Sequence, residues 1–181
     1  MQYLLPILFL ALLACNEQKP LTDNPTTTDF TLLPASHTNI SFSNQITETD
    51  TLNYFTYPYL YLGAGVATGD FNNDGQTDVF FTGNMVDNQL YLNRGDFQFE
   101  NITTSANVAA ENKWSTGVTL VDVNTDGWLD LYVCVSGKTG DKQNLLFINN
   151  QDLTFTEAAA EYGLADNGAS IQYVFFDYDR D

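Results

Sequence analysis

The strongest constraint on the fold of this chain is an internal repeat. Residues 65–81 align position by position with residues 117–133, and both segments carry the pattern Asp-x-Asn-x-Asp-Gly-x-x-Asp. The match continues downstream, where Asn-Gln-Leu-Tyr-Leu-Asn at 88–93 corresponds to Asn-Leu-Leu-Phe-Ile-Asn at 144–149. A chain built in this way is expected to fold as a series of similar units that pack on one another.

Each repeat predicts four short strands, because runs of β-branched and aromatic residues alternate with Gly, Asn and Asp clusters. In the second copy the expected strands are 117–123, 128–135, 144–149 and 153–157. Four strands in a repeat of about 50 residues are typical of a β-propeller blade. The predicted fold class is therefore all-β, a partial β-propeller with two full four-stranded blades and the start of a third.

A third copy of the repeat opens at Tyr173 and reaches an acidic cluster at Asp177. A propeller closes with at least about four blades. We therefore expect this sequence to be part of a longer protein, unless several chains assemble the ring.

The N-terminal residues resemble a bacterial lipoprotein signal. An apolar run from Leu4 to Ala14 is shorter than the about 20 residues that a membrane span needs. It ends in Leu-Leu-Ala-Cys15, which is similar to a lipobox, although no Lys or Arg precedes the run. The resemblance implies cleavage before Cys15 and lipidation of that residue. The alternative is a buried N-terminal strand or helix with an incidental Cys.

These patterns divide the chain into six expected parts. They are a lipoprotein signal peptide (1–14), a polar tether (15–35), lead-in strands (36–64), a first blade (65–112), a second blade (113–168) and the truncated start of a third blade (169–181). The signal and tether predict a cell-envelope location. The expected form is an outer-membrane lipoprotein on the periplasmic or the outer face, held to the membrane by its lipid.

The charge balance limits the possible partners. Six Lys and Arg against 23 Asp and Glu give a net charge of -17. Nucleic acid is excluded as a partner, because phosphate binding requires a basic face. Charged residues make up only 16% of the chain, which indicates that the acids serve a local purpose.

The two acidic loops indicate what the acidic residues do, because their pattern predicts calcium sites. Hard divalent cations take six to eight oxygen ligands from carboxylates, amide carbonyls and backbone carbonyls on a sharply turning loop. In each loop the side chains at positions one, three, five and nine and the backbone carbonyl at position seven can converge on one ion. The predicted ligands are Asp70, Asn72, Asp74, Gln76 and Asp78 in the first loop, and Asp122, Asn124, Asp126, Trp128 and Asp130 in the second.

The alternative is that the loops are plain hairpin turns, for which Asp-Gly is a strong signal. That interpretation explains positions five and six but leaves the Asp residues at positions one and nine as coincidence in both copies. An EF-hand is rejected because position twelve is Phe81 or Val133 where Glu is required. Soft metals are excluded by the lack of His and Cys close to the loops.

The two full repeats resemble the FG-GAP or VCBS repeat, the blade unit of the integrin α-chain propeller. The residues around the loops, with Gly-Val-Ala-Thr-Gly-Asp70 and Trp114-Ser-Thr-Gly-Val-Thr-Leu-Val-Asp122, are most similar to bacterial relatives of cartilage acidic protein, of the ASPIC/UnbV type. The resemblance implies calcium in the hairpin loops and a complete ring of about seven blades. It does not imply a reaction.

We therefore expect a calcium-binding module of a cell-envelope lipoprotein that binds an unknown protein or glycan and is not an enzyme. No Ser-His-Asp, Cys-His or HExxH arrangement occurs in the sequence. The alternative is a fragment of a calcium-dependent polysaccharide lyase or another carbohydrate-active propeller enzyme. That alternative needs a Lys or Arg that faces the metal in a cleft, for which the candidates are Lys113, Lys138 and Lys142.

Two weaker features complete the sequence analysis. Tyr54, Tyr57, Tyr59 and Tyr61 give an aromatic stripe, for which packing against the first blade is favoured over stacking on sugars. Cys134 lies in an apolar run and is expected to be a small buried hydrophobe, since a reactive thiol needs exposure and a lowered pKa.

Overall fold

The computed structural model describes residues 30–179 of the 181. All the elements described below belong to one compact unit that begins at Leu33. The predicted signal peptide and Cys15 lie outside the described residues. Within the described part, no helix has the length and apolar character needed to cross a membrane.

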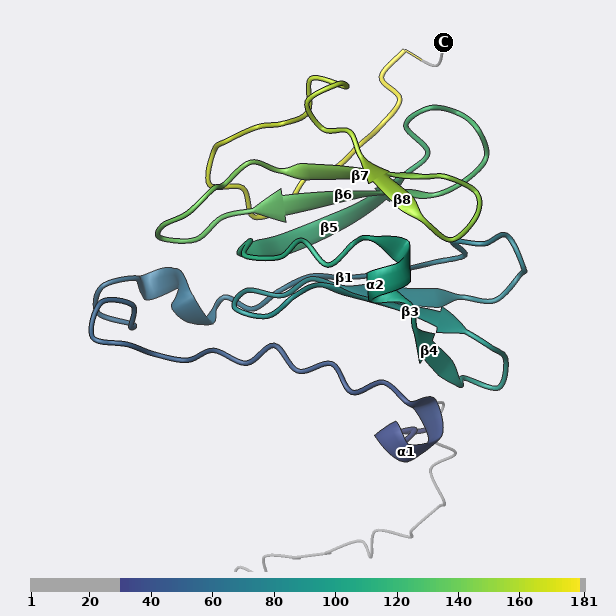
Figure 1. Cartoon of the computed structure of the whole chain (residues 1–181), viewed down its shortest axis with the longest axis horizontal. Helices are drawn as coiled ribbons and strands as arrows, with labels where there is room; N and C mark the ends of the chain where they lie inside the picture. The colour runs from purple at the N-terminus through teal and green to yellow at the C-terminus, as the bar shows by residue number, and fades with distance from the viewer. Residues whose placement is uncertain (1–29, 180–181) are drawn as a thin grey trace, which may run out of the picture. The chain divides into compact units, whose positions relative to one another are not determined.

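Two four-stranded antiparallel sheets form the structure, one from each full repeat (Figure 1). The strands follow the chain order within each sheet, so every connection is a hairpin. The first sheet contains β1 (Val66–Gly69), β2 (Asp78–Phe81), β3 (Gln89–Asn93) and β4 (Phe99–Asn101), and the second contains β5 (Ser115–Val121), β6 (Asp130–Val135), β7 (Leu145–Asn149) and β8 (Phe155–Glu157). The predicted all-β, propeller-like fold is confirmed, with four strands in each repeat.

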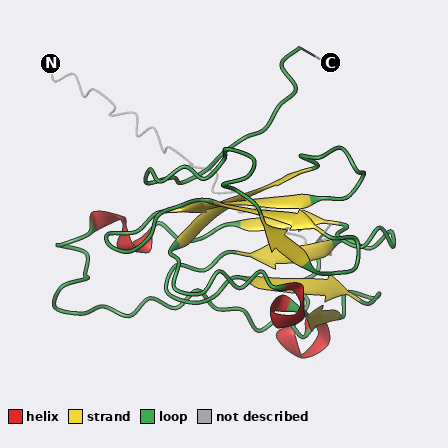
Figure 2. Ribbon diagram, turned by 45° about the horizontal axis from the view of Figure 1, so that its top comes forward, coloured by secondary structure: helices red, strands yellow, loops and turns green. Residues whose placement is uncertain are grey.

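In the part of the chain that the structure describes, helix is confined to short segments. These are α1 (Ala35–Thr38), the 3-10 helix η1 (Pro58–Tyr61) and α2 (Thr103–Ala106). Figure 2 shows the strands as two neighbouring layers with the helical turns outside them.

The hydrophobic core lies between the two sheets. Phe80 of β2 and Leu90 of β3 are fully buried and share one cluster with Leu131 and Val133 of β6. Alternate residues of a strand point to opposite faces, which places these side chains on the facing surfaces of the two layers. Burying one such side chain stabilises the fold by about 1.5–3 kcal/mol.

The second sheet is covered on its other face as well, so that all six residues of β6 are buried. Tyr132 and Cys134 belong to a second cluster that includes Tyr173 and Phe175 from the third copy of the repeat. The ring of Tyr132 makes edge contacts with both of these rings, at centroid distances of 5.2 and 5.3 Å. Burial raises the pKa of the Cys134 thiol to about 11, in agreement with an inert buried hydrophobe.

The segment before the first blade differs from the prediction. Lead-in strands were expected over residues 36–64, and that prediction is wrong, because the segment contains only α1, η1 and turns. The side-chain oxygen of Asn53 accepts the backbone N–H groups of Phe55 and Thr56, an Asx turn that competes with strand pairing. Pro58 adds a fixed φ and has no N–H to donate to a ladder.

The lead-in segment nevertheless covers the outer face of the first sheet. The Phe42 ring stacks on Phe81 with a centroid distance of 4.8 Å, and Phe81 in turn makes an edge contact with Tyr91. Asn44 and Asn84 exchange two hydrogen bonds, of 2.7 and 3.0 Å. Both sheets therefore have protein on each face.

Successive repeats approach each other closely at one glycine in each copy. A Cβ atom on Gly65 would lie 2.7 Å from the Thr116 carbonyl oxygen at the start of β5, closer than real Cβ contacts allow. One repeat later, the Gly117 N–H donates to the Ile171 carbonyl at 2.9 Å, and a Cβ there would overlap the same oxygen. A side chain at either position would force neighbouring repeats apart.

We predict that Gly117→Ala destabilises the chain by about 1–3 kcal/mol, because the added methyl group has to displace the backbone at Ile171. Urea unfolding followed by circular dichroism measures the change. Gly168→Ala is the matched control, since a Cβ there meets nothing closer than the Asp166 carboxylate at 3.4 Å. Equal stability of the two variants would contradict the close approach.

Candidate functional site

The two acidic loops occupy equivalent places in the two sheets. The first joins β1 to β2 and the second joins β5 to β6, and the flanking strands pair in the same register, with Gly69 opposite Asp78 and Val121 opposite Asp130. Their backbones also agree. Residues with φ of 56° and 85° in the first loop have counterparts of 59° and 84° in the second, at Asn73, Gly75, Thr125 and Gly127.

The first Asp of each loop closes it by accepting backbone N–H groups. The Asp70 carboxylate receives the N–H of Asp74 at 3.1 Å and the N–H of Gly75 at 2.8 Å. Asp122 receives the corresponding groups, from Asp126 at 3.0 Å and Gly127 at 2.9 Å. Position one therefore determines the turn of the loop through charge-assisted hydrogen bonds.

The third and fifth positions also point toward each other. In the first loop the Asn72 amide donates to the Asp74 carboxylate at 2.9 Å, and the Gln76 N–H donates to the other Asp74 oxygen at 2.8 Å.

The second loop repeats both bonds. The Asn124 amide donates to Asp126 at 3.0 Å, and the Trp128 N–H donates to Asp126 at 2.9 Å. The structure thus brings together the predicted side chains at positions one, three and five in each copy. The residues at position seven donate their N–H groups to the Asp at position five. The prediction for these residues concerns their carbonyl oxygens and stays a prediction.

The ninth position is the buried end of the site. Asp78 is fully buried, and its two oxygens accept the N–H of Phe71 at 2.9 Å and that of Asn93 at 2.8 Å. Asp130, also fully buried, accepts the N–H of Val123 at 3.0 Å and that of Asn149 at 2.8 Å. Each carboxylate therefore links the start of its loop to the third strand of the sheet.

Burial and neighbouring charge act on these carboxyl groups in the same way in both repeats. Burial raises the pKa of Asp78, its two backbone hydrogen bonds oppose that effect, and the negative charges of Asp74 and Asp70 raise the pKa further. The pKa of Asp130 is raised by burial and by Asp126 and Asp122. In each loop the two outer carboxylates are thus close enough to act on the buried one.

The arrangement stops short of a formed metal cage. Between residues 30 and 179, no three Asp, Glu, His or Cys side chains are grouped so as to hold an ion as they stand. The carboxylates instead satisfy the N–H groups of their own loops.

Two asparagines at the ends of β3 and β7 also contribute to the site, although they were not among the predicted residues. The Asn93 amide donates to the Thr77 carbonyl at 3.0 Å. The Asn149 amide donates to the Leu129 carbonyl at 3.3 Å and also to the Phe71 carbonyl, in the first repeat, at 2.8 Å. The alignment of the repeats pairs these two asparagines, and that pairing was the available signal.

Comparison with known proteins agrees with the doubled loop. Residues 70–133, from the first Asp of the first loop into β6, match the family described as the FG-GAP-like repeat. The chain therefore contains an FG-GAP-like repeat. The family resemblance that the sequence motifs indicated is therefore confirmed.

Two curated relatives are similar to part of the chain. Cartilage acidic protein 1 of Xenopus tropicalis is 35% identical over 69 residues, which cover 38% of this chain and 11% of the relative. Cartilage acidic protein 1 of Homo sapiens is 35% identical over 69 residues, covering 38% of this chain and 10% of the relative. The match thus spans about a tenth of the length of these relatives.

We expect Asp130→Asn to destabilise the chain by about 1–3 kcal/mol even without any metal. The amide replaces one acceptor oxygen by a donor that faces a backbone N–H, which leaves a buried hydrogen bond unmade. Thermal unfolding in EDTA measures the loss. Asp96→Asn, in an exposed turn, removes the same charge and should leave the melting temperature within about a degree. If both variants have the melting temperature of the wild type, the buried carboxylate does not stabilise the loop.

Proposed function

We propose that this chain is a calcium-stabilised binding module of a cell-envelope lipoprotein, acting in binding or adhesion without catalysis. The observation that carries the proposal is the repetition of one oxygen-rich loop, with the same side chains, backbone angles and hydrogen bonds, at the same edge of two successive sheets. Plain hairpin turns do not require an acid at positions one and nine in both copies.

The donor set fits a hard divalent cation. Each loop offers three carboxylates, one amide and one backbone carbonyl, all of them oxygen ligands of the kind that calcium prefers. The ligands would be Asp70, Asn72, Asp74, Gln76 and Asp78 in one loop, and Asp122, Asn124, Asp126, Trp128 and Asp130 in the other. Bound calcium would supply positive charge that offsets the repulsion among the carboxylates.

The hydrogen bonds within the loops support a coupling between metal and stability. Asp70 and Asp122 already hold their loops in a turn by accepting two N–H groups each. The remaining lone pairs of these carboxylates are available, because one carboxylate has about four acceptor positions. A cation that binds only the folded loop stabilises the folded chain by mass action.

The positions of the lysines favour binding over the lyase alternative. Lys113 precedes β5, and Lys138 and Lys142 lie in the connection from β6 to β7. The acidic loop of the same sheet joins β5 to β6, which is the opposite end of both strands. Six residues of β6 span about 20 Å, so none of these three amines can act beside the loop carboxylates.

A protein or glycan ligand and a lipid anchor are further parts of the proposal. The anchor depends on Cys15, which follows Leu-Leu-Ala in the sequence. Lipidation there would hold the module at the outer membrane, on its periplasmic or its outer face. One acyl chain gives only marginal membrane binding, and stable anchoring requires more than one.

We expect calcium to raise the melting temperature of the chain and EDTA to lower it. At about 100 times the dissociation constant, each independent site contributes about 2.7 kcal/mol, which is large for a domain whose total stability is about 5–15 kcal/mol. Asp74→Ala and Asp126→Ala should each reduce the response of the melting temperature to calcium. Asp96→Asn should preserve it. An unchanged melting curve in EDTA, with no heat of calcium binding in calorimetry, would show that the loops are plain turns.

For the lipid anchor, radiolabelled palmitate should enter the wild-type chain expressed in a bacterium and fail to enter Cys15→Ser, because the thiol is the acceptor. Globomycin, which blocks cleavage of lipoprotein signals, should cause the uncut precursor to accumulate. Gel electrophoresis with autoradiography detects both effects. Cys134→Ser is the control and should label like the wild type. Equal labelling of Cys15→Ser and the wild type would exclude lipidation at this residue.

A further inference from the structure

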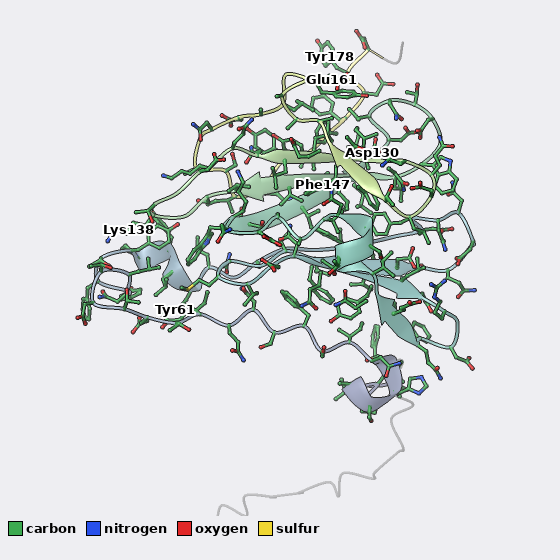
Figure 3. The ribbon with its side chains drawn as sticks, viewed as in Figure 1. Tyr61, Asp130, Lys138, Phe147, Glu161 and Tyr178 are labelled. Atoms are coloured by element: carbon green, nitrogen blue, oxygen red, sulfur yellow. The ribbon has the colours of Figure 1, made fainter. Side chains whose placement is uncertain are left out.

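A cavity of about 480 Å³ lies at the end of the second sheet away from the acidic loops. Four separate segments form it, namely residues 57–63, the start of β5, the connection from β6 to β7, and residues 169–171. Its size falls within the range of about 300–1,000 Å³ that is common for small-molecule sites. Figure 3 shows Lys138 and Tyr61 at this end of the sheets and Asp130 toward the other end.

Three aromatic rings form one side of the cavity. Tyr57 makes edge contacts with Trp114, at a centroid distance of 5.8 Å, and with Tyr59, at 5.9 Å. Tyr59 still exposes 60% of its surface, although the sequence favoured packing of this aromatic stripe against the first blade. The lead-in segment therefore presents the Tyr59 ring to solvent at the mouth of a cavity.

Two of the lysines that the structure describes line the cavity. Of the four Lys and Arg between residues 30 and 179, Arg94 pairs with Glu100 and Lys113 pairs with Asp141, each at 2.5 Å. Lys138 and Lys142 form no salt bridge with another described residue, and both line the cavity. The Lys138 amine donates to the Thr51 carbonyl at 2.7 Å, which holds the loop against the lead-in segment.

The two lysines are the charged residues among those that line the cavity. Among the described residues that line the cavity, none is Asp or Glu, although the whole chain has 23 of them. The net charge of -17 does not prevent an anion from binding here, because salt screens exposed charges beyond about 8 Å. The charged groups that line the cavity are therefore two amines.

We infer that this cavity binds a carboxylate-bearing sugar, such as one uronate unit of an acidic polysaccharide. Aromatic rings pack against the apolar face of a pyranose ring, and the hydroxyl group of Ser136 in the lining can bond a sugar hydroxyl. The amines of Lys138 and Lys142 pair with the carboxylate. A phosphate ligand is less suited, since phosphate sites favour Arg and clustered backbone N–H groups.

The inference rests on the proposed role in binding, and it gives that role a ligand class. It does not depend on calcium, because the acidic loops lie at the other end of β5 and β6. The loss of calcium sites would be detected by the melting experiment alone, and the loss of sugar binding by the titration below. Failure of one experiment therefore leaves the other interpretable.

The test is calorimetric titration of the full chain with trigalacturonate in 1 mM calcium. Three matched ligands accompany it, namely the fully methyl-esterified trimer, the neutral trimer of galactose and the peptide tetraglutamate. We expect binding of trigalacturonate at least about tenfold tighter than that of each other ligand, because only it combines pyranose rings with carboxylates. Equal binding of the esterified trimer would overturn the role of charge. Equal binding of tetraglutamate would show that the cavity does not require a sugar. No binding of trigalacturonate would show that the cavity is not a site for acidic sugars.

Two substitutions locate the site, and a third serves as the control. Lys142→Gln should weaken trigalacturonate binding about five- to tenfold, since it removes a charge-assisted bond. It should leave the fold intact, because Lys142 forms no salt bridge with another residue between 30 and 179. Tyr59→Ala should weaken it through lost stacking. Arg94→Gln, which removes the same charge from the turn between β3 and β4, should bind like the wild type.

Circular dichroism of each variant checks that the sheets remain folded. If Lys142→Gln and Arg94→Gln weaken binding equally while both remain folded, the effect is one of net charge and the assignment to this cavity is wrong.

Discussion

The buried carboxylate at the ninth position of each loop is the interaction on which the rest of the site depends. Asp78 accepts one N–H from its own loop and one from Asn93 at the end of β3. A buried carboxylate without partners is strongly destabilising, so the loop and the third strand have to form together. Asp130 imposes the same condition on the second sheet. The buried carboxylate at position nine therefore helps to position the carboxylates at positions one and five of the same loop.

The two repeats are also joined to each other by hydrogen bonds from side-chain amides to backbone carbonyls. The Asn149 amide reaches from β7 to the Phe71 carbonyl in the first loop, and the Asn73 amide reaches the Gly127 carbonyl in the second at 3.3 Å. Gly65 and Gly117 allow successive repeats to approach within backbone contact. Stability in such a stack is the sum of each repeat and its interfaces with its neighbours. A ligand that orders one loop therefore also acts on the next.

Much of the fold could be predicted because the sequence of a blade occurs in two copies. The local signals are the alternation of residues along the strands and the Asp-Gly turns. The alignment of Asn93 with Asn149 is a signal that comes from the repeat. The lead-in segment has no second copy, and its conformation depends on the Asx turn at Asn53 and on Phe42 stacking against Phe81. The cavity joins four segments far apart in the sequence, which no local pattern reveals. The bonding of the loop carboxylates to N–H groups likewise required the structure.

Cys134 gives the second sheet a property beyond packing. It is fully buried in β6, with a thiol pKa of about 11, under the layer formed by Tyr173 and Phe175. Only a thiolate reacts readily with alkylating reagents, so modification requires both access and a normal pKa. Both return when that layer separates from the sheet. The rate of alkylation at Cys134 therefore reports how often the outer face of the second sheet opens in the native chain.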